Sequence, residues 1–443
     1  MKKNSFLLLI LLGAIPAIAQ TTTNYGTNSG TQGAESSFFG YKAGEVNTAS
    51  NNTFIGSFSG SVNSTGDANV FIGKNSGKSN TIGRQNFFGG VSSGYFNTTG
   101  KQNLFTGYGS GYYNTTGTNN VFLGFQAGFN NSTANQNTFV GMHSGYSNTV
   151  GSNNVFNGSM AGRYNTSGAH NTFVGSSSGY KNTTGANNVF LGGTSGYANT
   201  TGSNNTFIGT NSAIKNTIGQ NNILSGFQAG YNNISGNSNT FYGISSGFTN
   251  TSGSNNTFLG FQSGHNNNTG SSNVFIGSNA GFYETGSDKL YIDNSTTTIP
   301  LIYGDFATNQ FGINTNTIPT GYTMAVNGKM IGEELKIQLV ANWPDFVFNK
   351  DYNLPTLTEV EKHILEKGYL RDVPNAKEVS ENGILLGEMN AKLLQKIEEL
   401  TLYIIQQQKD IQQQKQELEL QKNINNKSEL RLEKIESILI KNK

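Results

Sequence analysis

The segment Asn188-Val189-Phe190-Leu191-Gly192 returns as Asn205-Thr206-Phe207-Ile208-Gly209, with a period of 17 in residue number, and this repetition decides the fold. The aromatic-x-Gly pattern occurs in fifteen copies. An extra residue in the fourth copy moves its small residue to Ser93. The successive spacings are 16, 17, 16 and 18, followed by ten spacings of 17, which indicates a repeat architecture. The first position holds Phe38, Phe54, Phe71, Phe87, Phe105, Phe122, Phe139, Phe156, Phe173, Phe190, Phe207, Leu224, Phe241, Phe258 and Phe275.

The repeating unit reads Asn-Asn-Thr/Val-Phe-Ile-Gly-x-x-Ser-Gly-Tyr-x-Asn-Thr-Thr-Gly-x. Its central positions are β-formers, and they are bounded by Gly and Asn, which tolerate a positive φ. Because so short a unit cannot hold both a strand and a helix, each copy is predicted to be one turn of a β-solenoid. Fifteen turns stacked about 4.8 Å apart give a rod of about 70 Å. Phe, Ser/Ala-Gly, Tyr and Asn then form columns, and stacked Asn can satisfy its own amides along the axis.

Alternation along each strand raises the question of which face is buried. Thr206 and Ile208 point to one face and Phe207 to the other. A narrow coil has room inside for one face only, which would leave an apolar stripe along the rod, and we expect three chains to bury that stripe together. The alternative is a wider single-chain coil with every Phe inside.

The composition excludes several protein classes. Of 443 residues, 57 are Gly, 6 are Pro and none is Cys, which excludes collagen, a disulfide scaffold, a cysteine nucleophile and a zinc–thiolate site. A net charge of +2 with 29 Phe and 19 Tyr is atypical of disorder. Charge is uneven, with 12 charged residues in 21–286 and 40 in 287–443.

The N-terminus has the pattern of a secretory signal peptide, predicted at residues 1–19. Lys2 and Lys3 precede a short apolar run, and Ala17 and Ala19 form a small-x-small cleavage pattern. The run is too short to span a membrane, and no later apolar stretch is long enough. We therefore expect export to the extracellular space or outer cell surface, with the periplasm as an alternative.

The remaining chain divides into five predicted parts. These are an N-terminal leader (20–37), the solenoid (38–286), a β connector (287–332), a small α+β module (333–386) and a coiled coil (387–443). Strands are expected at 289–293, 301–303 and 322–326, with a hairpin-type turn at Asn327-Gly328. A capping box at Thr356 and Glu359 opens a helix ending at Gly368, and a short helix at 376–379 ends at Gly383.

The last helix, opening at 387–390, carries heptads typical of a coiled coil about 80 Å long. The a positions are Asn390, Ile397, Ile404, Ile411, Leu418, Asn425, Leu432 and Leu439, and the d positions are Leu393, Leu400, Gln407, Gln414, Gln421, Ser428 and Ile435. These layers do not choose between two and three strands, although repeated Gln at d favours a trimer. A single amphipathic helix folded on its own chain is the alternative.

Two resemblances extend these predictions. The repeats at 188–192 and 205–209, with small residues at Ser195 and Ser212, resemble the head repeats of trimeric autotransporter adhesins (YadA-like), which implies a left-handed β-roll and a homotrimer. They differ in their longer period of 17 and in having Phe where that family has Ala. Residues 343–405 resemble a C-terminal module of exported surface and fibre-like proteins of the Bacteroidota, placed like a tail-fibre chaperone and coiled-coil end.

No catalytic, metal or cofactor site is expected, and we predict that the chain is not an enzyme. His143, His170, His265 and His363 are scattered without metal-ligand spacing, and calcium-binding rolls need an Asp in each repeat, where only Asp67 occurs. No Gly-rich loop opens a strand–helix unit, and no basic stripe favours nucleic acid. Self-cleaving tail-fibre modules use a Ser-Asp pair before a basic run, and Ser287-Asp288 is followed by Lys289-Leu290 instead.

The predicted function is that of an exported structural or adhesive fibre. Its partners would be two further copies of the chain and a surface glycan or protein, held by many weak identical sites. An ice-binding solenoid is one alternative, against which the Thr column is interrupted by Ile82, Val150 and Ile218. A phage-tail-fibre-like binding protein is another alternative.

Overall fold

The computed structural model describes residues 23–338 and 343–442. The chain divides into two compact units, residues 1–330 and 331–443. The predicted signal peptide, residues 1–19, lies outside the described residues.

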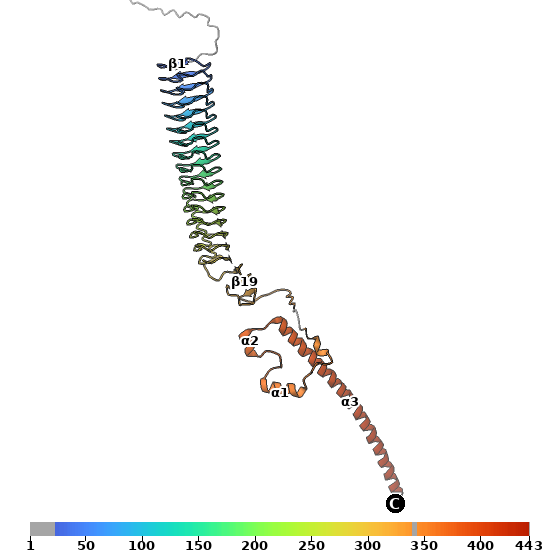
Figure 1. Cartoon of the computed structure of the whole chain (residues 1–443). Coiled ribbons are helices and arrows are strands. Elements are labelled where there is room, and N and C mark those ends of the chain that lie inside the picture. The colour runs from blue at the N-terminus through green and yellow to red at the C-terminus, as the bar shows by residue number, and fades with distance from the viewer. Residues whose placement is uncertain (1–22, 339–342, 443) are drawn as a thin grey trace, which may run out of the picture. The chain divides into compact units, whose positions relative to one another are not determined.

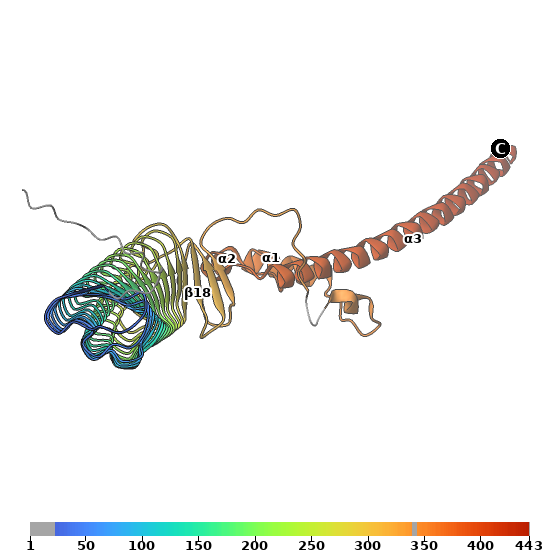
Figure 2. The ribbon, with the colours of Figure 1, turned by 90° about the horizontal axis from the view of Figure 1, so that it is seen from above.

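The first unit is a β-solenoid with about 17 residues per turn, which confirms the predicted fold class (Figure 1). Each short strand from β1 to β17 pairs in parallel with the strand one turn away, so that Phe190 lies opposite Phe207. Seen from above, the turns follow one another along a common outline (Figure 2). The strands are β1 (Thr23–Tyr25), β2 (Ser37–Phe39), β3 (Thr53–Ile55), β4 (Val70–Ile72), β5 (Phe87–Gly89), β6 (Leu104–Thr106), β7 (Val121–Leu123), β8 (Thr138–Val140), β9 (Val155–Asn157), β10 (Thr172–Val174), β11 (Val189–Leu191), β12 (Thr206–Ile208), β13 (Ile223–Ser225), β14 (Thr240–Tyr242), β15 (Thr257–Leu259), β16 (Val274–Ile276) and β17 (Lys289–Ile292).

The fourth copy is in a different register from the predicted one. Phe88, not Phe87, pairs with Phe71 and Phe105, and it is fully buried, whereas Phe87 is 39% exposed. With Phe88 in the column, the spacing is the same on both sides as in the later copies, and Ser93 is in its regular place. The irregularity therefore came from the alignment, because two adjacent Phe residues compete for one position.

Every Phe of the corrected column lies inside a single chain. Phe207 is fully buried and Ile208 is 40% exposed. Every Phe therefore lies inside, as in the alternative of a wider coil, and the interior has room for the rings. The room comes from the second Gly of each copy, because a Cβ at Gly196 would lie 2.5 Å from the Phe190 ring. The rings stack along the axis, with centroids 4.7 Å apart for Phe190 and Phe207. The flanking residues, such as Ile208, form a partly exposed outer face, as the alternation predicted, and its burial by three chains stays a prediction.

Two buried Asn columns accompany the Phe column, and they confirm that stacked Asn satisfies its own amides. In one, Asn199 Nδ2 donates to Asn182 Oδ1 at 2.7 Å and to Gly202 O at 3.0 Å. In the other, Asn205 Oδ1 accepts from the backbone N of Asn222 at 3.0 Å. Each amide thus supports the neighbouring turn, which makes a polar interior stable because its groups are paired.

The ends of the solenoid differ from its interior. Strand β1 lies in the predicted leader and puts the exposed Asn24 opposite Phe38, so that a polar residue ends the Phe column. At the other end, Tyr291 of β17 meets Phe275 edge-on, and its hydroxyl donates to Glu284 Oε2 at 2.8 Å. Burial, followed by the Glu284 carboxylate, raises the pKa of Tyr291. The solenoid thus extends one turn beyond the fifteen copies at each end, and polar groups close it, as in other repeat proteins.

The connector continues the sheet with a change of direction. Strands β18 (Ile302–Asp305) and β19 (Gln310–Ile313) are antiparallel to their predecessors, and β20 (Met324–Val326) pairs in parallel with β19. Strand β19 was not predicted. Asn327-Gly328 was predicted to turn a hairpin, but no strand follows it in the described part of the unit.

The second unit is helical in its described residues. It contains a 3₁₀ helix, η1 (Pro344–Phe348), and the helices α1 (Leu357–Lys367), α2 (Ala376–Asn382) and α3 (Leu386–Lys441). The predicted capping box of Thr356 and Glu359 and the left-handed C-cap Gly368 are both present. Asn375 and Glu378 form a second capping box. Because caps are local, the sequence predicted the helix ends well.

Candidate functional site

The outer surface of the solenoid is the candidate functional site, because stacking repeats each side chain along it. The residue after the second Gly of each copy forms an aromatic column. Its rings stack with centroids 5.0 Å apart for Tyr112 and Phe129 and 4.8 Å apart for Tyr180 and Tyr197. The first three copies hold Glu45, Ser61 and Lys78 at this position. From the fourth copy on, the residues of the column are half-buried, namely Tyr95, Tyr112, Phe129, Tyr146, Arg163, Tyr180, Tyr197, Ile214, Tyr231, Phe248, His265 and Phe282.

Cations cover the ring faces where the aromatic column is interrupted. Lys78 Nζ lies 5.2 Å from the centroid of Tyr95, and Arg163 lies 5.7 Å from that of Tyr146. Lys215 Nζ lies 5.5 Å from the centroid of Tyr231. These are cation–π distances. Because stacked neighbours or cations occupy these faces, the column presents mainly ring edges and hydroxyl groups to a ligand.

The residue after the first Gly of each copy forms a second outer column with two apolar patches. One patch contains Val91, Tyr108, Phe125 and Met142, which are 43% to 54% exposed. The other contains Phe227, Ile244 and Phe261, at 47% to 50%. Between the patches the column holds only Ser159, Ser176, Gly193 and Thr210. Contiguous exposed apolar side chains of this kind mark interaction surfaces.

The hydroxyl of the first Thr in each Asn-Thr-Thr-Gly turn donates a hydrogen bond to a backbone carbonyl of the next turn. Thr183 Oγ1 donates to Thr200 O at 3.0 Å, and Thr200 Oγ1 donates to Thr217 O at 2.9 Å. Only the second Thr column is left to face solvent, and Ile82, Val150 and Ile218 interrupt it. The Thr columns therefore serve stacking more than they offer a regular array of free hydroxyls.

The cations of the solenoid have few acidic neighbours. Lys74, Lys78, Arg84, Lys101, Arg163, Lys181 and Lys215 lie in a stretch with no Asp or Glu between Asp67 and Glu284. The ion pairs in the described part of this unit are Lys42–Glu45 and Lys289–Asp305. The middle of the rod is thus weakly basic, with charge spread over many turns.

The four histidines are not brought together. His143 Nε2 lies 3.0 Å from Gln126 Oε1, and burial, then Arg163, lowers the pKa of His143. His265 stacks between Phe248 and Phe282, His170 has a positive φ, and His363 lies in the other unit. In the described ranges no group of three His, Cys, Asp or Glu side chains could hold a metal ion.

Ser287 and Asp288 serve the stacking of the last turn. Ser287 Oγ accepts from the backbone N of Ser271 at 3.0 Å, and the backbone N of Asp288 donates to Ser271 O at 2.9 Å. Asp288 has a φ of 60°, like the residues at the same place in earlier turns, such as Ser272 with 59°. The pair therefore follows the repeat pattern of the turns before it.

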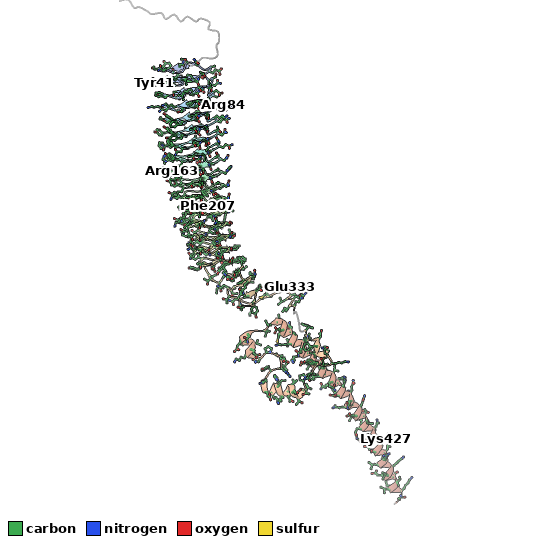
Figure 3. The ribbon with its side chains drawn as sticks, viewed as in Figure 1. Tyr41, Arg84, Arg163, Phe207, Glu333 and Lys427 are labelled. Atoms are coloured by element: carbon green, nitrogen blue, oxygen red, sulfur yellow. The ribbon has the colours of Figure 1, made fainter. Side chains whose placement is uncertain are left out.

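The second unit exposes the heptad side chains of α3. The apolar a residues are between 38% exposed, for Ile411, and 64%, for Leu439. Around Lys427 no other described segment of the unit lies beside the helix (Figure 3). Sequence reasoning had predicted this apolar seam of a and d positions, and within a single chain it is uncovered in the described residues.

Comparison with known proteins gives no family. No protein-family model matches the chain, and no curated protein is significantly similar to it. Among the described helices, none is long and apolar enough to cross a membrane.

Proposed function

We propose that the protein is an exported fibrous protein with a structural or adhesive role, in which the β-solenoid acts as a repetitive binding rod. The observation that carries the proposal is the register of the outer columns, since the strand pairing of Phe190 with Phe207 repeats at every turn. Weak contacts at successive turns then add up, because the second contact of a ligand is intramolecular. The signal-peptide pattern at 1–19 supports export.

The proposal includes self-association through α3 as a parallel homotrimer. A long helix with an exposed apolar seam is unstable alone, and a coiled coil is the usual way to bury such a seam. The resemblances to trimeric autotransporter adhesin heads and to the Bacteroidota C-terminal module support the same arrangement. The engaged Thr hydroxyls favour this function over ice binding, which needs a regular array of free hydroxyls.

The adhesive role is tested by removing whole turns from the mature full-length chain. Deletion of residues 120–153 removes two turns including Phe125 and Met142, and deletion of 171–204 removes two turns whose second column holds Ser176 and Gly193. Both deletions keep the stacking register. We measure retention of the variants on immobilised glycans, matrix proteins and cells.

Equal loss of retention in both deletions would show that binding is spread along the rod, as multivalency requires. Loss only with 120–153 would place adhesion at the apolar patch. The adhesive function is refuted if the intact chain is retained on no ligand and cells lacking the protein adhere normally.

A further inference from the structure

Helices α1 and α2 have well-formed ends but no core of their own. Both open with complete capping boxes, yet neither contains a buried residue. Helices of 11 and 7 residues are too short to be stable in water without tertiary packing. The apolar side of α1, with Val360 and Ile364, therefore needs a partner.

Two contacts tie α1 to α3 without packing the helices together. Tyr403 Oη donates to Pro355 O just before α1, and Lys396 Nζ lies 3.5 Å from Asp372 Oδ2 after it. Between these ties, no Cα of α1 lies within 8 Å of a Cα of α3. Helices in direct contact have axes 8–10 Å apart and bring some Cα atoms closer than that. The chain thus holds α1 away from α3.

The space between the helices is an apolar groove of about 540 Å³. Val360, Ile364 and Leu370 line one side, and Leu393, Ile397 and Leu400 line the other. His363 also lines it, and its buried Nε2 has no hydrogen-bond partner among the described residues. An apolar groove with an unpaired buried nitrogen is an incomplete interface.

The α3 side of the groove is the start of the heptad seam. Leu393, Ile397 and Leu400 are d, a and d residues, 46% to 59% exposed, and the seam continues to Ile404 and Ile411. In the described residues of the unit no second long helix could cover the seam. The element that covers it farther along α3 must also run into the groove, because the seam is continuous.

We infer that the groove holds α3 of a second copy, so that α1 of each chain clasps the α3 of a neighbour. The inference rests on the proposed self-association. A parallel arrangement is favoured, because it places Gln407, Gln414 and Gln421 each in a layer with the same residue of the other chain. The side-chain amides within one layer can then hydrogen-bond to one another. An antiparallel arrangement that matches the ends of the helices brings Ile411 nearest to the Gln414 layer instead.

The test uses the absence of Cys from the chain, since an engineered cysteine is then the only thiol. Full-length mature chains with Ile364→Cys are co-expressed with tagged chains carrying Leu393→Cys, and tagged–untagged disulfides are measured after mild oxidation. Leu365→Cys is the matched control, because Leu365 is 81% exposed and does not line the groove. A chain pair carrying Ile411→Cys reports self-association through the seam alone.

The clasp predicts that the Ile364 pair forms disulfides about tenfold faster than the Leu365 pair, since two cysteines bridge only when their Cα atoms are within ~7 Å. It is overturned if Ile411→Cys chains crosslink while the Ile364 pair does no better than the Leu365 pair. If Ile411→Cys chains also fail to crosslink, the proposed self-association is refuted and the clasp with it.

Discussion

The solenoid and the helical unit solve the burial of apolar side chains in opposite ways. In the solenoid, Phe207 is fully buried by its own chain, with a stacked ring on one side and Leu224 on the other. In α3, Ile404 and Ile411 are 57% and 38% exposed in one chain. The solenoid therefore buries its core within one chain, whereas the helical unit leaves an apolar seam exposed that the proposed self-association would bury. Four predictions test this comparison.

The largest effect is expected for the Phe column. Phe207→Ala removes a fully buried ring and should reduce the free energy of unfolding by about 3–5 kcal/mol, because the tightly stacked turns cannot collapse into the cavity. Urea unfolding of the mature chain measures it, with Ile208→Ala as the control at about 1 kcal/mol or less. Similar values for both variants would mean that the column is not the core of the solenoid.

A somewhat smaller effect is expected for the Asn column. Asn199→Ala removes the donor to Asn182 Oδ1 and Gly202 O and the acceptor for Asn216 Nδ2. The buried partners left unpaired should cost about 3 kcal/mol in the free energy of unfolding. Hydrogen exchange should also show increased opening of the adjacent turns, because each turn is stabilised by its neighbours.

The control for the Asn column is Asn130→Ala. Asn130 is half-buried, and its side chain makes no hydrogen bond within the described residues. Its replacement should change the free energy of unfolding by about 0.5 kcal/mol or less. If both Asn variants behaved alike, the buried amide ladder would contribute nothing beyond packing.

The third prediction concerns the helical unit. Ile411→Ala should destabilise the oligomer by about 2 kcal/mol per chain, because the seam is buried only on association. It should also lower the molar mass at low protein concentration, measured by light scattering. Gln416→Ala, on the side of α3 opposite the seam, is the control. A molar mass equal to that of one chain for the unsubstituted protein would show that α3 is a solvated single helix.

Local patterns made much of the fold predictable from the sequence. The constant period of the repeats predicted the solenoid, and the capping box at Thr356 and the glycines Gly368 and Gly383 predicted the helix ends. The direction of the Phe side chains was not predictable, because it depends on how wide a turn the Gly and Asn residues leave. Strand β19 was missed because Gln310 and Gly312 weaken its β pattern.

The outer columns were predictable as columns, whereas their exposure was not. The periodicity placed Tyr112 and Phe129 one above the other. Whether the ring faces are free depends on neighbours such as Lys78 and Arg163, whose side chains follow no repeat. The groove between α1 and α3 was not predictable from the sequence, since it depends on the distance between the two helices in the folded unit.

The smallest effect is expected at the closed end of the solenoid, where Lys289 Nζ lies 2.6 Å from Asp305 Oδ2. The hydrogen bond from Lys289 lowers the pKa of Asp305. A carboxyl whose pKa is lowered on folding stabilises the protein above its unfolded pKa, about 3.9, and that stability is lost as the pH falls through the folded pKa. Asp305→Asn should therefore cost up to about 1 kcal/mol at pH 7, and this cost should become smaller as the pH falls below about 3.9.

Urea unfolding of both proteins between pH 7 and pH 2 measures this difference. In the buried interior of the solenoid, neutral Asn amides and Phe rings make the contacts between turns, so Phe207→Ala should keep its effect over the same pH range. A pH-dependent cost of Phe207→Ala, or a pH-independent cost of Asp305→Asn, would contradict this division between the neutral interior and its charged end. Acid should therefore loosen the closed end of the rod before it affects the stacked turns.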